Sequence, residues 1–281
     1  MNVKITTETP ATRPVPDPLT SSVLDHALAA GNVKENAEFG LRNNEGLWPS
    51  YNCMDTLIPT PICPDPEFTK TFSHAEWVPG LEFAVHGGAQ CKAVGLDKAD
   101  MASEINRVFG LNEGKGIEMV LLFNRFVATD SDVFPAWAAP VDLTPVSGPT
   151  GLLALPVALA LLEGYAAQNY AGKPTIHMPR AAATMLGERI VWKGDLAFTR
   201  NGSKVAMGGG YDTSEADGTW DLYATGEVYI ERSEQVDVST FVIPGDGTDA
   251  AIGDNSVLSL TERMYRVAVD CFVAKATAKV W

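Results

Sequence analysis

Hydrophobic residues recur at helical spacing between Asp97 and Thr129, the longest stretch of this kind in the chain. Met101, Ile105 and Val108 form one apolar stripe that resumes further on, while charged residues fall mostly off it. A single helix over this range would measure about 50 Å, more than the roughly 30 Å diameter of a small domain. The pattern therefore predicts a long helix in an elongated protein.

Three glycines, Gly110, Gly114 and Gly116, interrupt this helical pattern. Each glycine weakens a helix interior by about 1 kcal/mol relative to alanine. Two helices joined at a bend are therefore nearly as compatible with the sequence as one continuous helix. Both alternatives stay open at the level of sequence.

Shorter patterns on either side predict further helices and strands. Helices are expected at residues 22–30, 156–170 and 180–186, with Gly31, Gly172 and Gly187 just past their ends. Strands are expected at residues 175–178, 189–193, 196–199, 204–207, 222–225, 228–232 and 257–276, with an Asn201-Gly202 turn. Because helices come first and strands later, the order indicates a segregated α+β architecture rather than alternating βαβ units.

Two segments before the long helix have a different character. Residues 1–20 carry four prolines among Thr and Ser, which disfavours both helix and sheet, so we expect an extended arm. Ordering such an arm costs about 1–2 kcal/mol per residue, and it could reach roughly 65 Å, so we expect it to strap a neighbouring copy. Residues 69–78 and 81–86 alternate loosely around Pro79-Gly80 and predict a projecting two-stranded ribbon that leans on another surface.

Composition and charge narrow the possible functions. The chain has 281 residues, 46% hydrophobic and 20% charged, which is typical of a globular protein. Its net charge of −14 disfavours binding to nucleic acid or anionic membranes, because phosphate affinity comes from clustered Lys and Arg. Residues 1–10 lack a signal-peptide core, and the longest apolar run, residues 152–162, is too short to cross a bilayer. We therefore expect a soluble protein without a membrane segment.

The cysteines offer one enzymatic hypothesis. Cys53, Cys63, Cys91 and Cys271 form no CxxC pair, which favours reduced, mostly buried thiols over a disulfide framework or a zinc site. Cys91 with a histidine, either His86 or His177, could act as nucleophile and base. No known cysteine-enzyme signature surrounds Cys91, so a buried structural thiol is the preferred interpretation.

Other candidate motifs are weak. Gly208-Gly209-Gly210 precedes no helix start and predicts a turn rather than a phosphate loop. Asp246, Asp249 and Asp254 lack calcium-loop spacing, and the histidines His26, His74, His86 and His177 lack paired metal-ligand spacing. The sequence therefore predicts no catalytic, cofactor-binding or metal-ligating residue. Extended parts of this kind favour contacts between identical copies.

Three short sequence motifs in the C-terminal half of the chain occur in a characteristic order. They are Thr175-Ile176-His177-Met178-Pro179-Arg180, Gly202-Ser203-Lys204-Val205 running into Gly208-Gly209-Gly210-Tyr211-Asp212, and Leu222-Tyr223-Ala224-Thr225-Gly226-Glu227-Val228. This order resembles tailed-phage major capsid proteins. The ending, residues 257–280, is similar to the closing strands of the Hong Kong 97-type fold. Residues 83–91, before the long helix, resemble capsid proteins of phages that infect actinobacteria. These segments cover about two thirds of the chain.

The resemblance implies a Hong Kong 97-like α+β fold with five parts. These are an N-terminal arm at residues 1–45, a connection and extended β-hairpin loop at 46–96, a spine helix and peripheral domain at 97–149, an axial domain at 150–255, and C-terminal strands returning to the peripheral domain at 256–281. Some relatives cross-link their subunits through a Lys-Asn isopeptide bond. Lys70 and Lys92 lie in the loop, but no Asn and Glu partners match, so we expect non-covalent contacts.

The resemblance also implies a function. Subunits would assemble as hexamers and pentamers into an icosahedral shell enclosing double-stranded DNA, without sequence-specific DNA binding, cofactor or membrane. Its partners would be itself, portal and scaffold proteins and a possible decoration protein, and it would assemble in the host cytoplasm and reside in the virion capsid. Two alternatives remain, an encapsulin-type bacterial compartment with the same fold and a thiol-dependent hydrolase using Cys91.

Overall fold

A computed structural model describes residues 19–35, 47–49, 77–79, 81–92, 98–123, 140–145, 153–211, 218–243 and 256–279. The helices are α1 (Val23–Ala29), α2 (Lys98–Phe123), α3 (Leu155–Asn169) and α4 (Arg180–Leu186), with a 3-10 turn at Gly187–Arg189. The strands are β1 (Val33–Glu35), β2 (Leu47–Pro49), β3 (Trp77–Pro79), β4 (Leu81–Lys92), β5 (Val141–Asp142), β6 (Leu153–Ala154), β7 (Thr175–His177), β8 (Ile190–Lys193), β9 (Leu196–Thr199), β10 (Lys204–Ala206), β11 (Thr219–Thr225), β12 (Val228–Arg232), β13 (Val236–Ile243), β14 (Ser256–Val269) and β15 (Val273–Lys279). The fold therefore mixes helices and sheets, as the sequence predicted.

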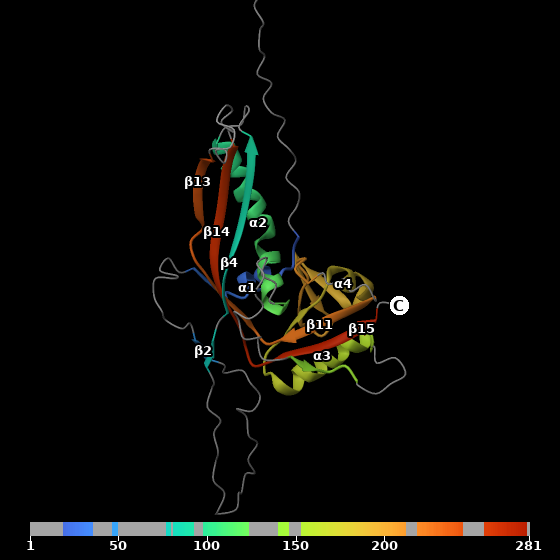
Figure 1. Ribbon diagram of the computed structural model, residues 1–281. Coiled ribbons are helices and arrows are strands. Elements are labelled where there is room, and N and C mark those ends of the chain that lie inside the picture. Colours follow the sequence, from blue (N-terminus) through green and yellow to red (C-terminus); the bar gives the residue numbers. More distant parts are fainter. Residues whose placement is uncertain are drawn as a thin grey trace, which may run out of the picture.

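The strands form two main sheets, and the helices pack on them (Figure 1). The first sheet has the order β1-β12-β14-β13, with β4 also paired to β14, and α2 lies along it. The second has the order β5-β15-β11-β7-β10-β9-β8, with β6 also paired to β15, and α3 packs on β15 and β11. A short pair, β2 with β3, forms a separate two-stranded sheet. Each main sheet thus buries one face under helices.

Helix α2 is continuous through all three of its glycines. Its 26 residues give a length of about 39 Å, so one helix rather than two is the correct alternative within residues 98–123. A Cβ atom on Gly114 would lie 2.7 Å from the Ser22 hydroxyl, and one on Gly116 would lie 2.8 Å from a Val85 methyl. These two glycines therefore permit close packing instead of breaking the helix. Residues 124–129, also predicted as helix, lie outside the described residues.

Two buried apolar clusters lie under the two sheets. The first packs α3 and α4 against the second sheet and includes Leu162, Ile176, Leu186 and Leu222. The second packs α1 and α2 against the first sheet and includes Val23, Ile117, Leu121, Ile230 and Tyr265. On α2, Ile105 is buried as predicted, but Val108 is 42% exposed and Phe109 is buried instead. No described helix is long and apolar enough to cross a membrane.

In the described part of the predicted ribbon, the two strands pair with other segments rather than with each other. Strand β4 pairs along β14 from Leu81 opposite Val267 to Lys92 opposite Ser256, while β3 pairs with β2. The long strand β14 offers β4 a ladder of twelve residues, and a lone hairpin is only marginally stable in water. Residues 69–76 lie outside the described part of the chain, as do residues 1–18 of the predicted arm.

The predicted strand at residues 257–276 is two strands in different sheets. The chain leaves β14 at Asp270, passes Cys271 with φ of 63°, and enters β15 in the other sheet at Val273. A second crossing from β11 to β12 lies beside it, since the Asp270 amide donates to the Glu227 carbonyl at 2.9 Å. A Cβ on Gly226 would lie 2.4 Å from the Asp270 carbonyl oxygen. The two crossings are therefore packed backbone against backbone.

The cysteine expectation also needs correction. Cys271 is disulfide-bonded in this structure, so the expectation of reduced thiols is wrong for this cysteine. The sulfur that it bonds lies outside the described side chains. Cysteine spacing along the chain missed this bond because pairing depends on tertiary proximity rather than on sequence separation.

Candidate functional site

Three segments far apart in the sequence meet at the second half of α2. The first is residues 19–25, which lead into and begin α1. The second is α2, and the third is the glycine loop, residues 207–211, after β10. The Met207 amide donates to the Ser21 carbonyl at 2.8 Å, which ties the loop to the N-terminal segment. Ser22 caps α1 by accepting from the Asp25 amide at 3.2 Å. We call this meeting point the Glu118 joint, after the side chain at its centre.

Glu118 is fully buried and receives three backbone amides. Its Oε1 accepts from Val23 and from Gly208, each at 3.0 Å, and its Oε2 accepts from Gly210 at 2.9 Å. None of the described Lys, Arg or His side chains forms an ion pair with it. Three N–H groups converging on one carboxylate form an anion-binding nest, which offsets much of the cost of burial.

The glycine loop is built for this contact. A Cβ on Gly208 would lie 2.6 Å from both Glu118 carboxylate oxygens. A Cβ on Gly210 would lie 2.4 Å from the Glu118 Cβ and 2.6 Å from the Lys115 carbonyl oxygen. Gly209 has φ of +131°, a conformation that side chains rarely adopt. The loop is a turn, as predicted, yet its amides do hold an anion, which is the protein's own carboxylate.

The protonation of Glu118 is finely balanced. Burial raises its pKa from the ordinary 4.5 to about 7, although the amides of Gly210, Val23 and Gly208 act in the opposite direction. Asp25 adds a smaller upward effect through charge repulsion. Near neutral pH the joint therefore contains both the carboxylate and the carboxylic acid.

A second buried carboxylate fixes α2 to the first sheet. Glu113 Oε1 accepts from Arg263 at 2.6 Å, from Arg232 at 3.3 Å and from the hydroxyl of Tyr265. Burial and the neighbouring carboxylate raise the pKa of Tyr265 well above its usual range. Glu113 and Glu118 are five positions apart, about 140° around the helix. Helix α2 is therefore anchored by two acidic side chains that point to different partners.

Two of the predicted candidate histidines have structural roles. His177 is fully buried, with Nδ1 at 2.7 Å from the Tyr211 hydroxyl and Nε2 at 2.9 Å from the Thr225 hydroxyl. Burial lowers its pKa to about 3, so it is neutral at physiological pH. His26 contacts the Ser21 hydroxyl at 3.0 Å and the Val205 carbonyl at 2.9 Å, and burial lowers its pKa as well.

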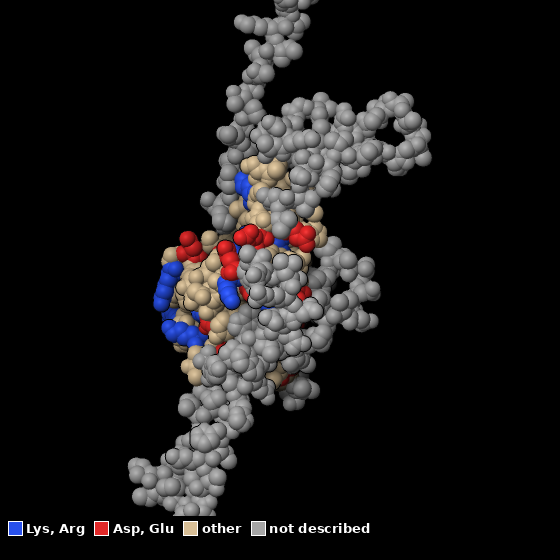
Figure 2. All heavy atoms as spheres, turned by 90° about the vertical axis from the view of Figure 1, so that its left-hand side faces the viewer, with Lys and Arg blue, Asp and Glu red and all other residues tan. Residues whose placement is uncertain are grey.

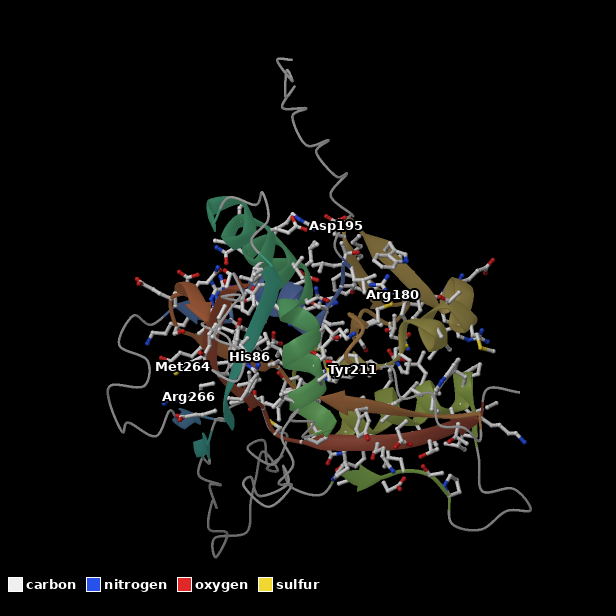
Figure 3. All side chains as sticks on the ribbon, turned by 45° about the horizontal axis from the view of Figure 1, so that its top comes forward. His86, Arg180, Asp195, Tyr211, Met264 and Arg266 are labelled. Carbon is white, nitrogen blue, oxygen red and sulfur yellow. The ribbon has the colours of Figure 1, made fainter. Side chains whose placement is uncertain are left out.

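The hydrolase hypothesis receives no support from these positions. Cys91 lies five residues from His86 along β4, about 17 Å on a strand, and His177 is occupied by Tyr211 and Thr225. His86 is exposed on β4, and α2 runs between it and Tyr211 in the view of Figure 3. The described residues include no cluster of three potential metal ligands. His74, Asp246, Asp249 and Asp254 lie outside the described part.

Sequence reasoning missed Glu118 as the central residue. It placed this residue with the charged positions outside the apolar stripe of the long helix, where exposure is the usual outcome. Its partners are main-chain amides, which leave no side-chain signal. The run Gly208-Gly209-Gly210 was the one available clue, since consecutive glycines permit amides to converge on an anion.

Comparisons with known proteins bear on the fold. No protein-family model and no curated protein sequence matches this chain. A chain from a structure of Mycobacterium phage Ogopogo matches with a TM-score of 0.52 and 12% identity over 94% of this chain and 93% of that chain. A Gordonia phage Cozz chain matches with a TM-score of 0.52 and 11% identity over 99% of this chain and 92% of that chain. A Mycobacterium phage Adephagia chain matches with a TM-score of 0.50 and 14% identity over 95% of this chain and 92% of that chain.

This chain shares its fold with these Mycobacterium and Gordonia phage chains. At such low identities the matches establish a shared fold, and they run over almost the whole of both chains. The order of short motifs predicted a resemblance to proteins of actinobacteria-infecting phages, and these matches confirm that resemblance at the level of the fold.

Proposed function

We propose that this protein is a major capsid subunit that assembles through copies of itself into a closed icosahedral shell. The observation that carries the proposal is the match with the Ogopogo chain, which covers 94% of this protein and 93% of that chain. A match over only part of each chain could reflect one common domain. Because this match covers almost all of both chains, it favours a common role for the two proteins, which we propose is that of a shell subunit. The order of short motifs described from the sequence supports the same role.

The proposed layout is Hong Kong 97-like, with the five parts given above from the resemblance. Helix α2 beside β4 and β14 suits the spine of a peripheral domain, and α3, α4 and the second sheet suit an axial domain. Strand β14 would lie in the peripheral domain, and β15 would follow it into the second sheet. Within the proposed N-terminal arm, residues 1–45, and loop, residues 46–96, helix α1 and strands β1 and β4 pack in their own subunit. Residues 1–18 and the part of the loop before β4 would reach neighbouring subunits.

The surface of the subunit favours burial against other copies. Met185 on α4 is 54% exposed, and Trp192 on β8 is 48% exposed. Exposed large apolar side chains are candidates for contacts with other proteins. We propose that neighbouring subunits of a hexamer or pentamer cover these two residues.

The charge of the chain suits a container for DNA that does not read its sequence. The net charge is −14, and the face in Figure 2 carries acidic and basic side chains together. Packaged double-stranded DNA would therefore be enclosed rather than bound at a specific site. The proposed further partners are portal, scaffold and possible decoration proteins, with assembly in the host cytoplasm.

Expression of the full chain followed by sizing and negative-stain imaging tests the proposal. We expect shells of uniform diameter, and Trp192→Asp should yield unassembled subunits with an unchanged circular dichroism spectrum. Arg200→Ala, which removes only a surface ion pair with Glu188, serves as the control and should still form shells. A protein that stays a monomer or small oligomer under all assembly conditions would contradict the proposal, and shells filled with protein cargo would indicate an encapsulin-type compartment instead.

A further inference from the structure

We propose that the Glu118 joint is a proton-controlled clasp between α2, the glycine loop and the N-terminal segment, closed more firmly by acid and loosened as the pH rises through neutrality. The proposal concerns the subunit itself and does not depend on its assembly. It goes beyond the capsid role by assigning a pH response to one side chain.

The geometry makes Glu118 a single side chain that contacts all three of these segments. Its two carboxylate oxygens accept from Val23 in the N-terminal segment and from Gly208 and Gly210 in the loop. The side chain has 0% exposure, so no solvent offsets its charge while the joint is closed. If the loop moves away, the same carboxyl reaches water. Opening therefore changes the surroundings of this one group more than those of its neighbours.

Helix α1 presents two titratable groups to the joint. Asp25 is held at the helix start, where its Oδ2 accepts from the amide and the hydroxyl of Ser22, each at 2.8 Å. Its negative charge disfavours a second charge on Glu118. His26 is buried against Val205, and burial lowers its pKa from 6.5, so it is neutral when Glu118 titrates.

Among the described residues, the other elements supply no cation that pairs with the carboxylate. On α2, Lys115 is exposed and its stem passes 4.0 Å from the Cβ position of Gly209 without pairing with Glu118. On β10, Lys204 pairs with Glu227 instead. At the end of the loop, burial and Glu118 raise the pKa of Tyr211 well above its usual range, so this phenol stays neutral.

The direction of the pH response follows from linkage. Glu118 has a pKa of about 7 in the closed joint and would return to about 4.5 in an open joint. Between these values the closed form binds more protons than the open form, so acid favours closure and rising pH favours opening. From pH 8.5 to pH 5.5 the closing equilibrium should strengthen by roughly 30-fold.

Hydrogen-deuterium exchange of the full chain at pH 5.5 and pH 8.5, corrected for intrinsic exchange rates, tests the clasp. We expect peptides covering residues 19–25 and 204–211 to gain roughly 30-fold in protection at the lower pH. Glu118→Gln should abolish this gain, because the amide cannot titrate. Glu188→Gln, which alters a side chain that is 95% exposed, should leave the gain intact.

Two results would overturn the proposal. One is equal protection of these peptides at both pH values in the unmodified protein, and the other is a pH response that persists in Glu118→Gln. If that variant does not fold, ¹³C NMR of glutamate carboxyls in the unmodified chain replaces it. A Glu118 resonance titrating near pH 7 supports the clasp, and a midpoint near 4.5 overturns it.

Discussion

A Cβ atom on Gly210 would lie 2.4 Å from the Cβ of Glu118, so the loop and the helix touch where only glycine fits. The Lys115 carbonyl oxygen at 2.6 Å and the Met119 amide nitrogen at 2.7 Å enclose the same position. These neighbours are helix backbone and cannot rotate away. We therefore expect Gly210→Ala to lower the free energy of unfolding by about 1–3 kcal/mol through overpacking.

Chemical denaturation followed by circular dichroism measures this effect. Gly164→Ala is the matched control, because Gly164 lies within α3 and a Cβ there meets nothing within 4 Å. That variant should gain about 0.5–1 kcal/mol from helix propensity. Equal effects of the two substitutions would show that the loop is not packed on α2.

The glycines of α2 allow a second comparison within one helix. Gly116→Ala would place a Cβ 2.8 Å from one methyl of Val85 and 3.1 Å from the other, and β-branched side chains have few alternative rotamers. We expect a loss of about 1–3 kcal/mol in thermal or chemical unfolding. Gly110→Ala meets no atom within 4 Å and should stabilise the protein by about 1 kcal/mol. A stabilising Gly116→Ala would contradict the packing of β4 on α2.

Removal of the Glu113 carboxylate should be strongly destabilising. Glu113→Ala leaves Arg263 and Arg232 without their shared buried acceptor, and breaking a buried ion pair on one side costs about 3–5 kcal/mol. The measurement is the shift of the denaturation midpoint at constant slope. Glu104→Ala on the same helix removes the pair with Arg107, in which the glutamate is 54% exposed, and should cost less than about 1 kcal/mol. Similar losses in both variants would argue against the Glu113 cluster.

His177 should make the fold sensitive to acid. Its pKa is about 3 in the folded protein and 6.5 when unfolded, so the unfolded chain binds the extra proton between these values. The stability due to neutral His177 is complete above pH 6.5 and falls by up to about 1.4 kcal/mol per pH unit as the pH drops toward 3. His177→Gln should flatten the dependence of unfolding free energy on pH, relative to the unmodified protein.

The comparison with the unmodified protein is needed because Glu118 acts in the opposite direction between pH 4.5 and 7. His86→Gln is the control, since His86 is exposed on β4. An identical pH profile for His177→Gln and the unmodified protein would contradict the neutral, buried state of His177.

Local signals explain which elements the sequence predicted well. Helix α1 begins at the Ser22 capping box and ends before Gly31, whose φ is +74°. Helix α4 and strand β9 have the predicted bounds, and the Asn201-Gly202 turn closes β9 on β10. In each case the residues that start or stop the element lie within a few positions of it, so a short window of sequence contains the information.

Long-range contacts explain what the sequence did not predict. The sequence pattern predicted that β4 pairs with the segment just before it. Its partner in the structure is β14, which lies more than one hundred and sixty positions further along the chain. Strand β13 was not predicted, and the strand break at Cys271 requires a positive φ that its residue type does not signal. The Glu118 joint depends on three such contacts at once, because helix, loop and N-terminal segment approach one another only after folding.

The two crossings between the sheets have a mechanical consequence. Only Asp270, Cys271 and Phe272 join β14 to β15, and only Gly226 and Glu227 join β11 to β12, with the two connections in contact. Connections this short leave little room for one sheet to slide along the other. We therefore expect bending between the two sheets to be centred on these five backbone positions, opposed by the contacts of the Glu118 joint.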